Sequence, residues 1–315
     1  MAQHRSTAEL LSEQGPFTLE LAIDMPAFTV GDWMLLNHQG RFQRLLDRQS
    51  LFTRKASGTP VDSQLIAANV DTVFVVCSLN DDFSLNRIER YLSLTKAAGV
   101  ETVVVLTKSD LCEDPHQWIN QVQSLNPLLM VEAVNGLDAN TATALEPWCQ
   151  EGKTIALLGS SGVGKSTLVN LLMGRELQQT SSIRQADSKG RHTTTARSLH
   201  LMSSGAILLD TPGMRELQIT DCEQGVKEVF ADIGELESQC RYSDCQHEEE
   251  PCCAVRSALE AGELDERRLN NYRKLLREQA VNSSTLAEKR SRDRNQSRYY
   301  RSVQTQARKR KEGSF

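Results

Sequence analysis

The sequence predicts an α/β protein whose central parallel sheet is preceded by a small β-rich segment and followed by a small helical domain. Three observations support this fold class. Short apolar runs, at residues 103–106 and 154–158, are typical of buried parallel strands. Residues 17–55 show strand-like alternation of apolar and polar side chains. Cysteines and a histidine cluster between residues 240 and 253, just before an amphipathic helical pattern.

The N-terminal strands are expected in "FTLELAI", "VGDWMLL", "RFQRLL" and "LFTRK", which are separated by Gly, Asn and Gln. Short strands at this spacing indicate a small barrel, although the segment is short for a complete five-stranded one. Its basic residues could contact the phosphates of RNA, or they could be ordinary surface charges. These residues are Arg41, Arg44, Arg48, Arg54 and Lys55.

The stretch "VVVLTKSDL" places Thr107, Lys108 and Asp110 just beyond the carboxyl end of a strand, where α/β sheets bind ligands. An Asp carboxylate at this point can accept two hydrogen bonds from N1–H and the exocyclic amino group of guanine. Lys108 would lie along the plane of the base, Thr107 could hydrogen-bond to it with a shorter reach than the usual Asn, and Ser109 is also expected to bind the nucleotide. Alone, the tetrapeptide is more typical of a solvated loop after a strand, and only together with a phosphate loop does it indicate guanine binding.

The stretch "GSSGVGKST" fits the G-x-x-x-x-G-K-[ST] pattern of a phosphate-binding loop, between an apolar strand and an amphipathic segment. Backbone N–H groups and the start of the helix would converge on a triphosphate. Lys165 would reach the β- and γ-phosphates, and the Ser166 hydroxyl would be a ligand of Mg²⁺. The residues expected to bind nucleotide here are Gly159, Ser160, Ser161, Gly162, Val163, Gly164, Lys165, Ser166 and Thr167.

Downstream, "AILLDTPGMREL" contains a D-x-x-G element after another apolar strand. Asp210 could hold Mg²⁺ through water, and the Gly213 N–H could face the γ-phosphate. The polar, Thr-rich stretch "SKGRHTTTARSL" lies between the phosphate loop and Asp210, and either a metal-sensing switch or a plain surface loop fits its composition. A third guanine-contact loop is expected in "VEAVNGLD", at either residues 132–133 or residues 135–136.

The order is therefore base reader, phosphate loop, first switch, second switch. The chain can begin at any strand of a sheet, provided that the same strands pair in the folded protein. This order of motifs is therefore that of a circularly permuted GTPase domain. Two other classes stay open: an ATP-using enzyme, because similar phosphate loops occur in transporter-type ATPases, and an RNA-binding module in which nucleotide only sets the conformation.

Together, "TKSDL", "GSSGVGKSTLVN", "GRHTTTARSL" and "DTPGMREL" resemble the ribosome small-subunit-dependent GTPase A (RsgA) family from about residue 25 onward. The resemblance implies an oligonucleotide-binding (OB) barrel at the N-terminus, a circularly permuted GTPase domain, and a role with the small ribosomal subunit and its rRNA late in assembly. Met214 occupies the position where Ras-like enzymes place a water-orienting Gln. His192 is our candidate for the catalytic residue, as the resemblance also implies, and Arg191 is a weaker one.

The stretch "CRYSDCQHEEEPCC" supplies thiolates and an imidazole in a set that Zn²⁺ favours in structural sites, where four protein ligands leave no position open. A disulfide-forming or unliganded cluster is the alternative. The chemistry does not separate Cys252 from Cys253. The family resemblance assigns the fourth ligand to Cys253, which gives the set Cys240, Cys245, His247 and Cys253.

The charge is unevenly distributed. The net charge is −5, yet residues 288–312 hold ten Lys or Arg against three Asp or Glu, a local balance of +7 that leaves −12 for the rest. Arginines at steps of four, four and three would form one basic stripe on a helix, or the tail could be solvated without fixed structure. No apolar run approaches the roughly 20 residues of a membrane span and the N-terminus has no hydrophobic signal core, so we expect a cytoplasmic protein without membrane contact. We also expect a monomer. Cys222 is expected at the surface.

The expected domain limits follow from these motifs. They are an OB-like β domain at residues 1–62, a circularly permuted GTPase domain at 63–219, a zinc-binding helical domain at 220–280 and a basic tail at 281–315.

Overall fold

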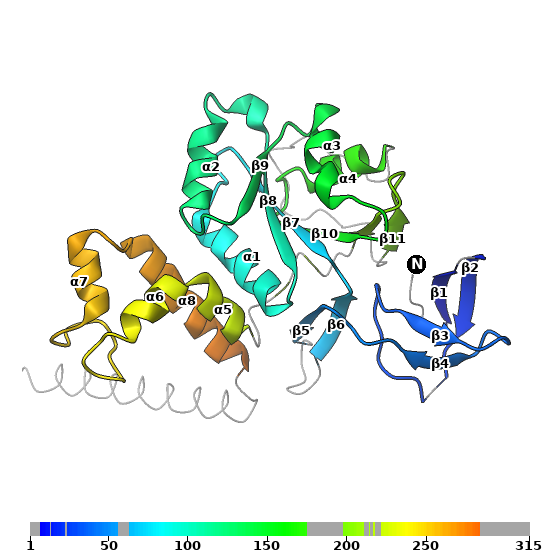
Figure 1. The fold of residues 1–315 in the computed structure, drawn as a ribbon, viewed down its shortest axis with the longest axis horizontal. Helices are drawn as coiled ribbons and strands as arrows, with labels where there is room; N and C mark the ends of the chain where they lie inside the picture. Colours follow the sequence, from blue (N-terminus) through cyan, green and yellow to red (C-terminus); the bar gives the residue numbers. More distant parts are fainter. Residues whose placement is uncertain are drawn as a thin grey trace, which may run out of the picture.

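The computed structural model describes residues 7–12, 14–22, 24–55, 63–174, 198–210, 214, 217 and 222–283. Figure 1 shows three parts, with strands β1 to β4 at the right and β5 and β6 below the central sheet, the sheet and its helices above, and the helices α5 to α8 at the left. This arrangement confirms the predicted fold class, including a β-rich N-terminal part and a helical C-terminal part.

The central sheet has six strands in the order β11-β12-β10-β7-β8-β9. All pairs are parallel except β11 with β12, which is antiparallel. Strand β8 precedes β10 in the chain and β12 follows it, so the permuted order expected from the motifs is confirmed. The strands are β7 (Thr72–Ser78), β8 (Glu101–Thr107), β9 (Met130–Ala133), β10 (Thr154–Leu158), β11 (Ser198–Leu201) and β12 (Ile207–Asp210).

Helices cover both faces of this sheet because its central strands are apolar on both sides. Side chains alternate between the faces of a strand, so Val73 and Val75 of β7 pack toward α1 and α2, while Phe74 and Val76 pack toward α3 and α4. Every residue of β7 and β10 is buried. The helices are α1 (Leu85–Ala97), α2 (Pro115–Gln123), α3 (Asn140–Leu145) and α4 (Lys165–Met173), with short 3₁₀ turns η1 (Ser109–Leu111) and η2 (Glu146–Trp148).

The N-terminal strands pair as three antiparallel hairpins, β1-β2, β3-β4 and β5-β6, and within the residues described here these are separate two-stranded sheets. Strand β1 lies ahead of the first strand that the sequence indicates. Strand β6 pairs with β5, so the hairpin pairing continues to Ala68, shortly before the central sheet begins at Thr72. The strands are β1 (Thr7–Ser12), β2 (Gly15–Glu20), β3 (Met34–Leu36), β4 (Phe42–Leu45), β5 (Leu51–Lys55) and β6 (Ser63–Ala68).

The C-terminal helices pack on the sheet through α1, and their apolar residues belong to the same core cluster as those of β7. Gly225 makes the close approach possible, because a Cβ there would lie 2.2 Å from the backbone oxygen of Ser93. The expectation of a surface Cys222 is wrong, since this residue caps α5 and is buried in that core. The helices are α5 (Glu223–Val229), α6 (Ala231–Glu237), α7 (Ala254–Ala261) and α8 (Glu266–Ser283).

No helix within the described part of the chain is long and apolar enough to span a membrane.

Candidate nucleotide site and metal centre

The phosphate loop joins β10 to α4, as the motif predicts. Gly159 has φ of 155°, and a Cβ at this position would lie 2.4 Å from the backbone oxygen of Val76. The backbone at the start of the loop therefore lies in close contact with the neighbouring strand β7. Only glycine, which has no Cβ, can occupy this position. Gly162 and Gly164 also have positive φ, and α4 begins directly afterwards at Lys165.

The Lys165 ammonium group lies inside this loop. Its side chain is buried, and Nζ donates to the carbonyl oxygen of Gly159 at 2.8 Å and to that of Ser160. A buried ammonium group needs such partners, because removing it from water is costly. The charge is thus held at the centre of a glycine-rich turn whose N–H groups precede a helix start, which suits a bound phosphate.

The base-reading loop is fastened to the phosphate loop by one hydroxyl group. Thr107 is buried at the end of β8, and its Oγ1 donates to the carbonyl oxygen of Val163 at 2.6 Å, with that of Cys77 3.3 Å away. Because the Thr107 hydroxyl donates its hydrogen bond to the phosphate loop, this side chain holds the base-reading loop and the phosphate loop in position relative to each other. Burial raises the pKa of the neighbouring Cys77 thiol to about 12, so this thiol is neutral.

The remaining base-loop residues point away from the core. Lys108 has a left-handed backbone with φ of 61°, and Asp110 is exposed within η1. The Ser109 N–H donates to the Val134 oxygen at 3.2 Å, which ties this loop to the end of β9. The carboxylate of Asp110 is therefore presented to solvent on a fixed backbone, as base recognition requires.

The third loop lies beside the same site. Residues 132–133 are within β9, and burial raises the pKa of Glu132. Residues 135–136 follow the carboxyl end of the strand, and a Cβ on Gly136 would lie 3.3 Å from Cγ2 of Thr167. Residues 135–136 therefore adjoin the phosphate loop, whereas residues 132–133 lie within the strand.

Some of the expected site residues fall outside the described part of the chain. They are Arg191, His192, the three switch threonines Thr193, Thr194 and Thr195, and Gly213. The expected basic tail also lies outside the described residues from position 284 onward. Asp210 ends β12, and its backbone pairs with Ser198 of β11. Met214 is 2% exposed, so the position that follows the D-x-x-G element holds a buried thioether.

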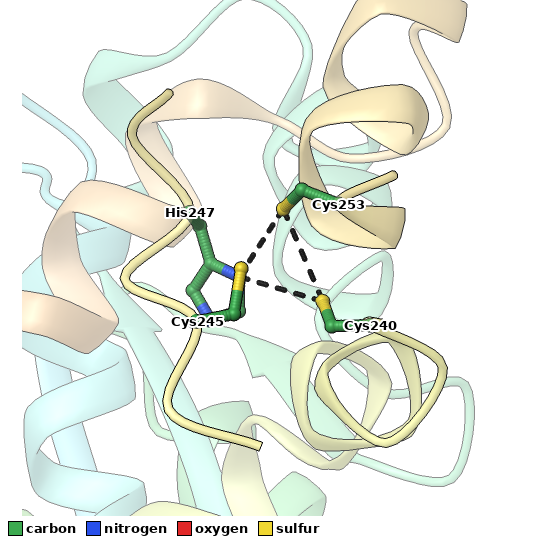
Figure 2. Close-up of side chains that lie close together, drawn as sticks. All are labelled: Cys240, Cys245, His247 and Cys253. Carbon is green, nitrogen blue, oxygen red and sulfur yellow. Dashed lines mark hydrogen bonds between the residues drawn. The ribbon is translucent and has the colours of Figure 1, made fainter. Parts of the chain in front are cut away.

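Between α6 and α7, the structure brings together four potential ligand atoms, from Cys240, Cys245, His247 and Cys253, all within 4.8 Å of one another (Figure 2). The Cys240 and Cys253 sulfurs are 3.9 Å apart, and His247 Nδ1 lies 3.6 Å and 3.3 Å from them. Zinc–sulfur bonds of about 2.3 Å place two sulfur ligands of a tetrahedral ion about 3.8 Å apart. The donor set and its spacing therefore fit Zn²⁺, whereas a disulfide requires sulfurs at about 2 Å.

Nearby groups orient these ligands. His247 Nε2 lies 3.3 Å from a carboxylate oxygen of Glu237, an arrangement that typically fixes the tautomer of a metal-binding histidine. Cys253 caps α7 and accepts the Arg256 N–H at 3.5 Å. Burial acts to raise the pKa of Cys240, but hydrogen bonds from backbone N–H groups at the start of α7 and from the neighbouring Cys253 and Cys245 thiols together lower this pKa. Cys252 is exposed and outside the cluster.

Two residues near these sites have no motif in the sequence. Glu237 lies one helical turn before Cys240, a spacing that could have indicated it. Tyr91 belongs to α1 and is buried in the core with Cys77 and Leu158, at the carboxyl ends of β7 and β10. Only the packing of α1 on the sheet brings Tyr91 there, so its sequence position gives no such signal.

Comparison with known proteins decides the family. The family model described as RsgA GTPase matches residues 45–220. The chain belongs to the RsgA GTPase family. A relative from Vibrio parahaemolyticus, named small ribosomal subunit biogenesis GTPase RsgA 2, is 57% identical over 99% of this chain and 87% of its own length. One from Mesorhizobium japonicum, named small ribosomal subunit biogenesis GTPase RsgA, is 46% identical over 89% of this chain and 82% of its own.

Two solved structures are similar to this chain in fold. The crystal structure of YjeQ from Thermotoga maritima superimposes with a TM-score of 0.63 at 28% identity, covering 86% of this chain and 94% of that one. YloQ, described as a circularly permuted GTPase, gives a TM-score of 0.59 at 23% identity, over 88% of this chain and 93% of that one, and so shares the fold.

Replacing Thr107 by valine tests the positioning role. The change leaves the buried Val163 oxygen without its donor, and an unsatisfied buried acceptor costs about 1–3 kcal/mol. We expect affinity for GDP and GTP to fall about tenfold, with no change in preference among purine bases, as measured by titration with fluorescent nucleotides. Thr95→Val is the control, because this buried hydroxyl bonds to Leu92 in α1. Loss of base preference in Thr107→Val would instead make Thr107 a base contact.

Proposed function

We propose that this protein binds GTP and hydrolyses it to GDP and phosphate, and that it acts in late maturation of the small ribosomal subunit. The observation that carries the proposal is the Thr107 hydrogen bond to Val163, which places the base-reading loop beside the phosphate loop. Membership of the RsgA GTPase family supports hydrolysis of GTP. The names of the relatives, which describe small-subunit biogenesis GTPases, support the ribosomal role.

The residues have distinct roles in this proposal. Asp110 accepts hydrogen bonds from guanine, and Lys108 lies along the base. The backbone of residues 159–167 cradles the phosphates, and Lys165 exchanges its carbonyl partners for phosphate oxygens. Ser166 and Asp210 would hold Mg²⁺, which neutralises charge that develops on the phosphates. Gly213 would direct its N–H at the γ-phosphate.

Hydrolysis needs a group that orients water, and the buried Met214 offers none. We assign this task to His192 in the first switch. Because the position after the D-x-x-G element lacks a polar side chain, turnover by the isolated protein is slow. The small subunit would accelerate it by ordering the first switch around the γ-phosphate.

The cluster of Cys240, Cys245, His247 and Cys253 would hold one structural Zn²⁺. Four protein ligands leave no position for water, so the ion contributes folding energy and takes no part in hydrolysis. Cys240 follows α6, Cys245 and His247 lie in the loop between the helices, and Cys253 caps α7. The ion would therefore hold α6, this loop and α7 together.

Ribosomal RNA is the proposed partner of the N-terminal hairpins and the basic tail at residues 281–315. Trp33 is 58% exposed, and Arg44 lies opposite Leu35 on the exposed side of the β3-β4 hairpin. Exposed aromatic and basic side chains bind bases and phosphates respectively. Arg48 is unsuited to this role, because its guanidinium donates to the buried Asp32 at 2.7 Å. We place the protein in the cytoplasm, as a monomer.

The rate of GTP hydrolysis with and without purified small subunits tests the proposal most directly. We expect stimulation of the wild-type protein, and about a hundredfold loss of the stimulated rate in His192→Ala with nucleotide affinity within about twofold. A wild-type rate that the subunits do not change would favour an RNA-binding module in which nucleotide sets the conformation. An intact stimulated rate in His192→Ala would remove His192 from catalysis.

Asp110→Asn tests base recognition. An amide in place of the carboxylate cannot accept both guanine hydrogen bonds, and we expect GTP affinity to fall about a hundredfold or more with a gain for xanthosine triphosphate. Competition among GTP, xanthosine triphosphate and ATP measures this preference. If ATP displaces GTP equally well from the wild-type protein, the site belongs to an ATP-using enzyme.

Cys240→Ser tests the metal centre, with Cys252→Ser as the matched control outside the cluster. We expect zinc content, measured by atomic absorption, to fall from about one ion per chain to nearly none in Cys240→Ser. The Tm should fall by about 5 °C or more, because a structural ion contributes folding energy. Equal loss of zinc in the control variant would contradict the ligand set.

A further inference from the structure

The candidate ligand His247 has a backbone conformation that is uncommon for a residue with a side chain. Its φ is 58°, in the left-handed region, where Cβ crowds the following carbonyl oxygen. Such a conformation persists only when the surrounding structure fixes it. The imidazole points toward the Cys240 and Cys253 sulfurs, which lie 3.6 Å and 3.3 Å from Nδ1 (Figure 2). The groups that fix this backbone therefore also keep the imidazole beside the cysteines.

Glu250 holds this loop through both of its carboxylate oxygens. Oε1 accepts the Gln246 N–H at 2.7 Å, and Oε2 accepts those of Glu248 and Glu249 at 2.9 Å and 3.1 Å. Hydrogen bonds to an ionised carboxylate are about twice as strong as those between neutral groups. The three donors lie before and after His247 in sequence, so one side chain holds the backbone on both sides of the candidate ligand.

The Arg273 guanidinium of α8 holds the same stretch from its carbonyl side. Its Nη2 donates to the carbonyl oxygens of Gln246 and His247, at 2.9 Å and 3.1 Å. The first carbonyl belongs to the peptide group before His247, whose orientation sets φ. The peptide group after His247, which sets ψ, is held at both ends, with its C=O on Arg273 and its N–H on Glu250. One cation and one anion thus fix both dihedral angles of His247.

The position of Glu250 suits the orientation of a ligand better than direct binding of the ion. Among the residues that the structure describes, the clustered ligand atoms come from three cysteines and His247, without Glu250. Both of its carboxylate oxygens accept backbone N–H groups instead. Glu248 and Glu249 are exposed, whereas Glu250 is half-buried. Of these three consecutive glutamates, Glu250 is therefore the one whose side chain turns back onto the loop.

We propose that Glu250 is a positioning residue of the metal centre, which holds the His247 backbone so that the imidazole faces the cysteines. With the backbone already fixed, less conformational freedom is lost when Zn²⁺ binds, so affinity rises. Groups that orient metal ligands commonly have such an effect. The inference rests on the proposed zinc site and adds a residue that acts on the ion only through His247.

Glu250→Gln tests the positioning role, with Glu248→Gln as the matched control. The amide keeps the length of the side chain but replaces one acceptor oxygen by an NH₂ group, which cannot accept a backbone N–H. Competition with a chelator of known affinity measures the Kd of the full-length protein for Zn²⁺. We expect this Kd to rise about tenfold or more in Glu250→Gln. It should stay within about twofold in Glu248→Gln, because Glu248 takes part only through its backbone N–H.

Co²⁺ in place of Zn²⁺ separates a positioning residue from a ligand, because its d–d absorption bands report the coordinating atoms. At saturating Co²⁺ the bands of Glu250→Gln should coincide with those of the wild-type protein, since three thiolates and an imidazole still coordinate. His247→Ala should shift the bands. Shifted bands in Glu250→Gln at saturation would show a change in the ligand set and overturn the inference.

A double-mutant cycle tests whether Glu250 acts through His247. Adding Glu250→Gln to His247→Ala should change the Kd for Zn²⁺ by no more than about twofold, because no imidazole remains to be positioned. Circular dichroism of each variant checks that its helices are formed. An equal effect of Glu250→Gln with and without His247 would overturn the inference, as would a wild-type Kd in Glu250→Gln or an equal loss in Glu248→Gln. A wild-type protein that binds no Zn²⁺ would overturn the proposed metal site itself.

Discussion

Strand β7 is buried on both faces and hydrogen-bonded along both edges, and both halves of the nucleotide site depend on it. The phosphate loop follows β10 on one side of this strand, and the base-reading loop follows β8 on the other. Gly159 crosses over the end of β7, while the Thr107 hydroxyl reaches the phosphate loop from the opposite edge. The permutation therefore changes the order of the strands along the chain and leaves their neighbours unchanged.

The same strand supports the C-terminal domain indirectly. Helix α1 follows β7 immediately and packs on its Val73 and Val75 face, so its position is fixed by the sheet. The buried carboxylate of Glu89, in α1, then accepts hydrogen bonds from side chains of α8. Candidate metal ligands and phosphate loop thus lie at two ends of one packed structure, although some eighty residues separate Lys165 from Cys240 and Cys245 in sequence.

Much of the fold was predictable because its signals are local. Uninterrupted apolar runs indicated β8 and β10, and the glycine pattern placed the turn before α4. The N-terminal hairpins were harder, because short half-exposed strands have weak periodicity and β1 carries no turn motif before it. The burial of Cys222 was missed for a related reason. Its environment is created by α1, which is distant in sequence, and no local pattern reports it.

The sequence by itself determined the chemistry: which residues can bind phosphate, read a purine base or hold a metal, because motif spacing fixes local geometry within one loop or turn. Tertiary structure decided which of these groups meet. It paired the Thr107 hydroxyl with the carbonyl oxygen of Val163, placed Cys253 and not Cys252 among the candidate metal ligands, and brought residues 135–136 to Thr167. Those contacts join segments far apart in sequence, and only the packing of buried strands and helices brings them within hydrogen-bond distance.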